Sequence, residues 1–165
     1  MQLTRTADYG VRVMTHLATI PENTLVNVEK LAAATGASPA FLGKILQRLV
    51  TARLIASRRG HAGGFRLARA PSTITMLDVI TALEGPLSLN ACLPGGAGCT
   101  RKAWCTALPV WVEAQTALAR VLSSKSLEDL ARMAGVKSGG ARRKYVRGAT
   151  GPARVARLNA PARQV

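Results

Sequence analysis

Acidic and aromatic residues are scarce in this chain. Among its 165 residues, Phe, Trp and Tyr make up 4%, and 8 acidic residues stand against 23 Lys and Arg, so the formal charge is +15. The few acids are scattered, and the sequence has no phosphate-binding glycine loop and no nucleophile with a partner, which argues against an enzyme. A polyanion is the expected partner of so basic a chain, and nucleic acid is the commonest polyanion.

Long apolar runs are also missing. No run approaches the about 20 apolar residues that a membrane-spanning helix needs, and the opening MQLTRTADYG lacks the apolar core of a secretory signal peptide. We therefore expect a cytoplasmic protein with no membrane partner, in a compartment that keeps thiols reduced. With 48% hydrophobic residues the chain can still bury the core of one domain.

Cysteine occurs only three times, and all three fall within residues 85–108, as Cys92, Cys99 and Cys105. Glycine and proline are frequent in this segment, so we expect a loop that neither a helix nor a strand crosses. The spacing is wider than that of a zinc knuckle or a thioredoxin-type pair. A metal or iron-sulfur site is favoured over three ordinary small apolar side chains, although a cluster usually takes four protein ligands.

The first half of the chain predicts a winged helix-turn-helix. Apolar periodicity indicates a helix over residues 4–19, and Asn27 opens a short helix, VEKLAAAT, that ends at Gly36. Ser38 caps a third helix with Pro39 at its first position. The following segment, LIASRRGHAGGFRLAR, reads as two short strands around a glycine-rich tip, which is a β-hairpin with basic residues.

These elements predict the residues that face DNA. The third helix should read base edges and the hairpin should contact the phosphate backbone. The candidates on the helix are Ser38, Ala40, Lys44, Gln47, Arg48 and Thr51, and those on the wing are Arg58, Arg59, His61, Gly63 and Arg66.

The second half predicts three further helical segments and a tail. Thr73 or Thr75 caps the helix MLDVITALEG, which Gly85 ends; Pro109 starts a long helix; and Ser126 caps the segment LEDLARMA. An apolar stripe follows the long helix through Trp111, Ala114, Leu118, Val121 and Leu122. Residues 136–165 hold eight basic residues and no acid, without apolar periodicity, which indicates a disordered basic tail.

The expected fold is therefore mainly α-helical with a small β-hairpin wing. We divide the chain into a winged helix-turn-helix DNA-binding domain (residues 1–84), a cysteine loop (85–108), dimerisation helices (109–135) and the basic tail (136–165). The stripe on the long helix is typical of a core by itself, but a small chain that reads palindromic DNA needs a two-fold partner.

The sequence resembles the Rrf-two family of bacterial winged-helix regulators, which includes the iron-sulfur regulator IscR and the nitric-oxide sensor NsrR. The resemblance rests on the opening QLTRTADYGVRVMTHLA, the segment SPAFLGKILQRLVTARLI, the wing RRGHAGGFRLAR and the cysteine loop followed by PVWVEAQTALARVL. It implies that Cys92, Cys99 and Cys105 hold a cluster, 4Fe-4S being favoured over 2Fe-2S. It also implies a homodimer with the long helix as its seam, bound to a palindromic operator in double-stranded DNA and acting as a repressor.

The resemblance leaves the fourth cluster ligand open. In IscR-type members a histidine stands three residues after the last cysteine, where this chain has Leu108. In an NsrR-type member a carboxylate comes from the other protomer, and Asp8 matches its position. Asp8 is equally explained as a first-turn acid that favours the helix dipole.

The sequence thus predicts a transcription regulator that responds to nitric oxide, redox state, or iron or cluster supply. The alternatives are a DNA-coating protein of nucleoid type with incidental cysteines and, less favoured, a cluster-dependent enzyme.

Overall fold

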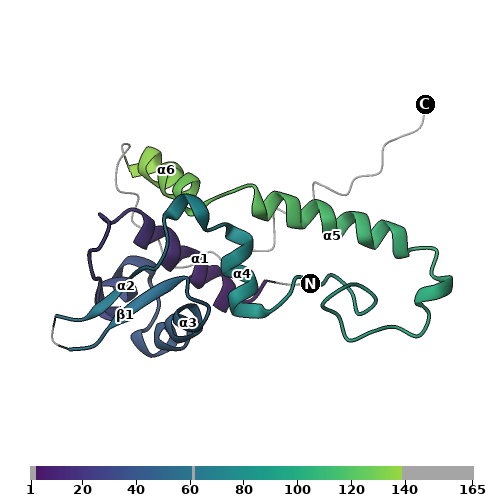
Figure 1. The fold of residues 1–165 in the computed structure, drawn as a ribbon, viewed down its shortest axis with the longest axis horizontal. Helices are drawn as coiled ribbons and strands as arrows, with labels where there is room; N and C mark the ends of the chain where they lie inside the picture. Colours follow the sequence, from purple (N-terminus) through teal and green to yellow (C-terminus); the bar gives the residue numbers. More distant parts are fainter. Residues whose placement is uncertain (1–2, 61, 139–165) are drawn as a thin grey trace, which may run out of the picture.

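The computed structural model describes residues 3–60 and 62–138 and consists of a compact head and a projecting arm (Figure 1). The head contains α1 (Arg5–Ala18), α2 (Val28–Thr35), α3 (Pro39–Thr51), β1 (Ile55–Arg58), β2 (Gly64–Leu67), α4 (Met76–Glu84) and α6 (Leu127–Ser138). The cysteine loop, residues 85–108, and α5 (Leu108–Ser123) form the arm. Two single 3-10 turns, η1 (Pro71–Thr73) and η2 (Lys102–Trp104), complete the described elements.

Side-chain caps fix the starts of the first three helices. The side chains of Thr4, Asn27 and Ser38 each accept a hydrogen bond from a backbone N–H in the first turn of α1, α2 and α3. Gly36 ends α2 in a left-handed conformation, φ 75°, that a side chain would disfavour. These boundaries confirm the helices predicted from the sequence.

The head packs α1, α3, α4 and the hairpin around one apolar core. Leu42, Ile45, Leu46 and Leu49 of α3 are all buried, as their spacing predicts. Gly10 lets α1 and α4 approach closely, because a Cβ built on it would lie 2.1 Å from Cδ1 of Leu83. The other large side chains that are fully buried are Val13, Met14, Leu31, Ile55, Ile74, Val79 and Leu127.

The hairpin is a two-stranded antiparallel sheet in which Ile55 pairs with Leu67 and Arg58 with Gly64. Gly64 is the first residue of β2. An isolated bridge between Val26 and Phe65 joins β2 to the segment before α2. The architecture confirms the predicted class, mainly α with a small hairpin wing on a helix-turn-helix.

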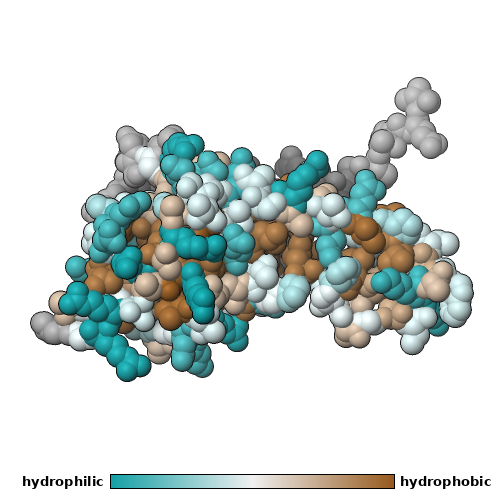
Figure 2. Space-filling model, in the orientation of Figure 1, coloured by the Kyte–Doolittle hydropathy of each residue, from teal (hydrophilic) through white to brown (hydrophobic). Residues whose placement is uncertain are grey.

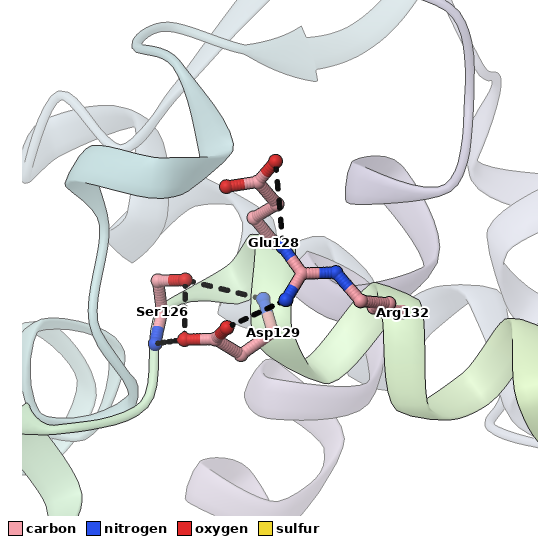
Figure 3. A network of polar contacts seen from close by, with 4 residues as sticks. All are labelled: Ser126, Glu128, Asp129 and Arg132. Carbon is pink, nitrogen blue, oxygen red and sulfur yellow. Dashed lines mark hydrogen bonds and ion pairs between the residues drawn. The ribbon is translucent and has the colours of Figure 1, made fainter.

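The starts of α4 and α6 each carry a capping box and lie side by side. Thr75, not Thr73, caps α4, and its hydroxyl and backbone N–H pair with Asp78. Ser126 and Asp129 form the same arrangement at α6, where Arg132 adds ion pairs to Asp129 and Glu128 (Figure 3). Backbone bonds from Met76 N to Lys125 O and from Leu127 N to Ile74 O join the two starts.

The second half differs from the sequence prediction in three places. α5 begins at Leu108, one residue before Pro109. The cysteine loop contains the turn η2, which no pattern indicated. α6 continues to Ser138, beyond the predicted segment LEDLARMA and into the residues assigned to the tail, whose residues 139–165 lie outside the described part of the chain.

None of the helices described here is both long and apolar enough to cross a lipid bilayer.

Candidate nucleic-acid interface and cysteine loop

The polar face of α3 is exposed, as a DNA-reading helix requires. Every predicted DNA-facing residue of this helix and its cap is solvent-exposed: Ser38, Ala40, Lys44, Gln47, Arg48 and Thr51. Two of the side chains are engaged locally. The Ser38 hydroxyl accepts from the N–H of Phe41 at 3.3 Å, and the Thr51 hydroxyl donates to the carbonyl of Gln47 at 3.0 Å.

Arg48 has a partner that the sequence did not reveal. Its Nη1 donates a 2.7 Å hydrogen bond to the backbone carbonyl of Leu83, in the last turn of α4. The two residues also line one shallow groove between α3 and α4, together with Lys44, Gln47, Thr51, Ala52 and Ala82. The last turn of α4 therefore borders the face that would meet DNA.

The wing presents Arg58 and Arg59 to solvent, as predicted. Gly63 occupies a position that only glycine fits, because an added Cβ would lie 2.3 Å from the carbonyl oxygen of Arg58. Arg66 points back toward the loop after α1, where it donates to Oδ1 of Asn23 at 3.2 Å. His61, also predicted to contact DNA, lies outside the described residues.

The cysteine loop is a series of backbone turns fastened to α5. Leu93 N donates to Asn90 O, Gly96 N to Leu93 O, and Gly98 N to Ala91 O. Gln115 of α5 holds both sides of the loop, because its Oε1 accepts from Leu89 N at 3.0 Å and its Nε2 donates to Pro94 O at 3.5 Å. Sequence reasoning missed Gln115, since a polar residue on a predicted helix carries no sign of a partner 26 residues away.

All three cysteines carry free thiols; Cys92 and Cys105 are half-buried and Cys99 is exposed. Three thiols in one loop suit iron by their chemistry. Within residues 3–60 and 62–138, however, no three Cys, His, Asp or Glu side chains converge on a position where they could hold a metal ion. A cluster bound by the three cysteines would therefore require the loop to close further than in this conformation.

Asp8 lies in the first turn of α1 and is about half-exposed. Its carboxylate forms a 2.8 Å ion pair with Arg12, one turn later on the same helix. The Arg12 guanidinium also lies 5.2 Å from the centre of the Tyr9 ring. This ion pair fits the role of Asp8 as a helix-stabilising acid, and the role of Asp8 as a ligand remains a prediction.

The predicted apolar stripe of α5 divides between the head and solvent. Leu122 is only 7% exposed and packs with Ala7 and Ile80, and the half-buried Leu118 packs against the same cluster. Leu122 therefore has little surface left for a second protomer. Ala114, Trp111 and Val121 are exposed, the last at 58%. Figure 2 shows apolar surface on the arm as well as on the head, and the exposed apolar residues Trp104, Val110 and Val112 belong to that arm.

An exposed polar helix in a helix-turn-helix, beside a basic hairpin, defines a winged-helix transcription regulator. The model of the Rrf2 family, described as an iron-dependent transcriptional regulator, matches residues 3–133. The chain belongs to this family, which is the Rrf-two family that the sequence resembles. Membership confirms the prediction that the chain is not an enzyme.

Relatives and solved structures agree with this assignment. A Mycobacterium tuberculosis protein named as an HTH-type transcriptional regulator is 44% identical over 88 residues, which cover 53% of this chain and 55% of that protein, so the match spans about half of this relative. CymR, the global cysteine regulator of B. subtilis, has a similar structure, with a TM-score of 0.66 and 29% identity over 81% of this chain and 98% of CymR. IscR of T. potens has a TM-score of 0.66 and 26% identity over 88% of this chain and 95% of IscR.

Proposed function

We propose that the protein is a homodimeric repressor whose binding to a palindromic operator is controlled by an iron-sulfur cluster in the cysteine loop. One observation carries the proposal: the loop with all three thiols lies between α4, which borders the DNA-facing groove, and α5, which exposes an apolar face. A change in the loop can therefore act on both the DNA-reading helix and the dimer.

We assign the DNA contacts to exposed residues of α3 and the wing. Ser38, Ala40 and Lys44 lie at the start and middle of α3, where recognition helices usually touch base edges. Arg58 and Arg59 on the wing carry positive charge for phosphates, and Gly63 allows the tight turn beside them, where an added Cβ would meet the wing's own backbone.

The exposed apolar surface of the arm supports a dimer. A palindromic site requires two copies related by a two-fold axis. The exposed Trp111 and Val121 of α5 offer an apolar surface that a second copy would cover.

Cys92, Cys99 and Cys105 would hold the cluster, with Asp8 of a second protomer as the candidate fourth ligand. A 4Fe-4S cluster is favoured, and it would supply iron that reacts with nitric oxide or oxidants. The similarity to IscR supports this assignment, and the similarity to CymR makes a cluster-free response of the thiols the competing outcome.

Anaerobic purification tests the cluster. We expect a brown protein with iron and sulfide in cluster stoichiometry, and bleaching when any one of the three cysteines is replaced by Ser. A protein that stays colourless after reconstitution with iron and sulfide contradicts the cluster.

Footprinting on genomic fragments tests the regulator. Protection of discrete palindromes supports operator binding, whereas uniform protection at the same salt concentration supports a DNA-coating protein. Arg59→Ala should weaken binding to all sequences and reduce the salt dependence by about one phosphate contact per wing, because a phosphate contact carries no sequence information.

A further inference from the structure

The last turn of α4 is tied to both helices that flank it. Arg48 of α3 donates to the carbonyl of Leu83 at 2.7 Å. On the other side, the Glu84 carboxylate accepts from the backbone N–H of Thr4 at 3.0 Å and from the Thr4 hydroxyl, at the start of α1. The next residue, Gly85, turns the chain at φ 84° out of the helix and into the cysteine loop.

The hydrogen bond from Arg48 satisfies one of the last carbonyls of α4. The last carbonyls of a helix have no partner within it, and basic side chains often donate to them. A guanidinium at this end also opposes the negative end of the helix dipole. The side chain of Leu83 is 3% exposed and packs closely against Gly10 of α1, so this residue contacts α1 through its side chain and α3 through its carbonyl.

The position of Arg48 in α3 agrees with this role. Recognition helices contact bases mainly through their first turns, whereas Arg48 lies in the last turn of α3. Its guanidinium is directed at α4 in the structure, while Lys44, one turn earlier on the same exposed face, is better placed to read DNA.

We propose that Arg48 is a positioning residue that fixes the recognition helix to the end of α4, so that a change in the cysteine loop alters how α3 meets DNA. The proposal rests on the proposed function and reassigns Arg48, which the sequence suggested as a reader of bases. The connection is short: loop residues move Gly85, Gly85 moves the Leu83 carbonyl, and Arg48 transmits that shift to α3.

The anchor is tested first in the free chain, without DNA. Arg48→Ala should speed hydrogen exchange of the amides of Glu84 and Gly85 by about tenfold, the effect of losing one charge-assisted hydrogen bond. Arg48→Lys, which keeps a cationic donor, should restore part of the protection. Lys44→Ala should leave exchange at these amides unchanged. Unchanged exchange in Arg48→Ala overturns the anchor.

The transmission is tested with the duplex that wild-type protein enriches from a random-sequence pool. Its Kd is measured for chains with intact cysteines and with Cys92→Ser, in wild-type, Arg48→Ala, Arg48→Lys and Lys44→Ala backgrounds. The affinity ratio between the intact and Cys92→Ser chains should fall toward one in Arg48→Ala, recover partly in Arg48→Lys and persist in Lys44→Ala. An unchanged ratio in Arg48→Ala, with altered preference at a single base pair, shows instead that Arg48 reads DNA.

The two proposals fail in different ways. If wild-type protein enriches no sequence, or Cys92→Ser has no effect on its affinity, the proposed regulator is rejected and the transmission with it. The exchange experiment still decides whether Arg48 anchors α4. If wild-type protein shows the effect of Cys92→Ser and Arg48→Ala retains it in full, the regulator stands and only the role of Arg48 is refuted.

Discussion

At the scale of single residues, two helical glycines that look alike in the sequence have opposite surroundings. Gly10 of α1 faces Leu83, and an added Cβ would overlap its side chain at 2.1 Å. Gly43 of α3 is exposed and has nothing within 4 Å of the same position. The contact between α1 and α4 therefore requires glycine at position 10, whereas position 43 of α3 has room for a side chain.

Gly10→Ala should lower the free energy of unfolding by about 1 to 3 kcal/mol, because an extra methyl in a packed site forces its neighbours apart. Gly43→Ala should raise it by roughly 0.5 to 1 kcal/mol, since alanine restricts the unfolded chain and favours the helix. Urea denaturation of both variants measures the difference. Equal effects would mean that α1 and α4 are not in close contact at Gly10.

The pH dependence of stability has a residue-scale cause in His16. Burial lowers the pKa of the His16 imidazole, at the end of α1. The folded chain thus keeps His16 neutral where the unfolded chain already binds a proton. The stabilisation is complete above the unfolded pKa of about 6.5 and is lost as the pH falls through the lower folded pKa.

Wild-type protein should therefore lose more stability than His16→Gln between about pH 8 and pH 5.5. Asp129 does not interfere in this range, because the hydrogen bonds from the Ser126 N–H and hydroxyl hold the pKa of its carboxyl below its usual value and keep it ionised. Urea midpoints at several pH values give both slopes. Parallel curves for the two proteins would contradict the effect of the partial burial of His16.

At the scale of elements, the sequence predicts starts and faces well and connections between elements poorly. Caps such as Ser38 and Thr75 act within four residues, so their signals are local and the structure confirms the helices they open. The bonds from Arg48 to Leu83 and from Gln115 to Leu89 join residues 35 and 26 positions apart. No periodicity records such pairs, so the sequence places Arg48 on the exposed face of α3 but does not predict its bond to α4.

The cysteine loop shows the same limit. Composition predicts a loop and the absence of long elements, but the turn η2 and the hydrogen bonds of Gln115 depend on how the loop folds onto α5. Spacing alone also suggested that the three thiols converge, which they do not in the described conformation. Convergence depends on the backbone of the whole loop and not on the distance between cysteines along the chain.

Gln115→Ala should release the loop from α5 while the head stays folded. We expect faster alkylation of the half-buried Cys92 by iodoacetamide, because the bonds to Leu89 and Pro94 are lost together. Gln115→Glu keeps an acceptor for the Leu89 N–H and should show a smaller effect. Thr116→Ala, which removes a hydroxyl bonded to Val112 of the same helix, serves as the matched control. Equal alkylation in all four proteins would show that Gln115 does not restrain the loop.

At the scale of the whole molecule, α5 serves two surfaces at once. Toward its end the helix contacts the head through Leu122, which packs on Ala7 of α1 and Ile80 of α4. The preceding residue, Val121, is 58% exposed. The apolar stripe predicted from the sequence includes both residues as dimer contacts. Which of two adjacent side chains faces the head depends on where α1 lies, and the sequence does not show this.

Substitutions at Val121 and Leu122 therefore distinguish a loss of dimerisation from a loss of folding. Val121→Arg adds a charge to the face that a second copy would cover, so the variant should become monomeric, with an unfolding free energy within about 0.5 kcal/mol of that of the wild-type monomer. Leu122→Arg places the same charge against the buried Ala7 and Ile80 and should lower that free energy by about 3 kcal/mol or more. Light scattering reports the mass and urea denaturation at low protein concentration reports the stability. A dimer that survives Val121→Arg places the seam on another face of α5, and a folded, stable Leu122→Arg monomer would mean that α5 does not pack on the head.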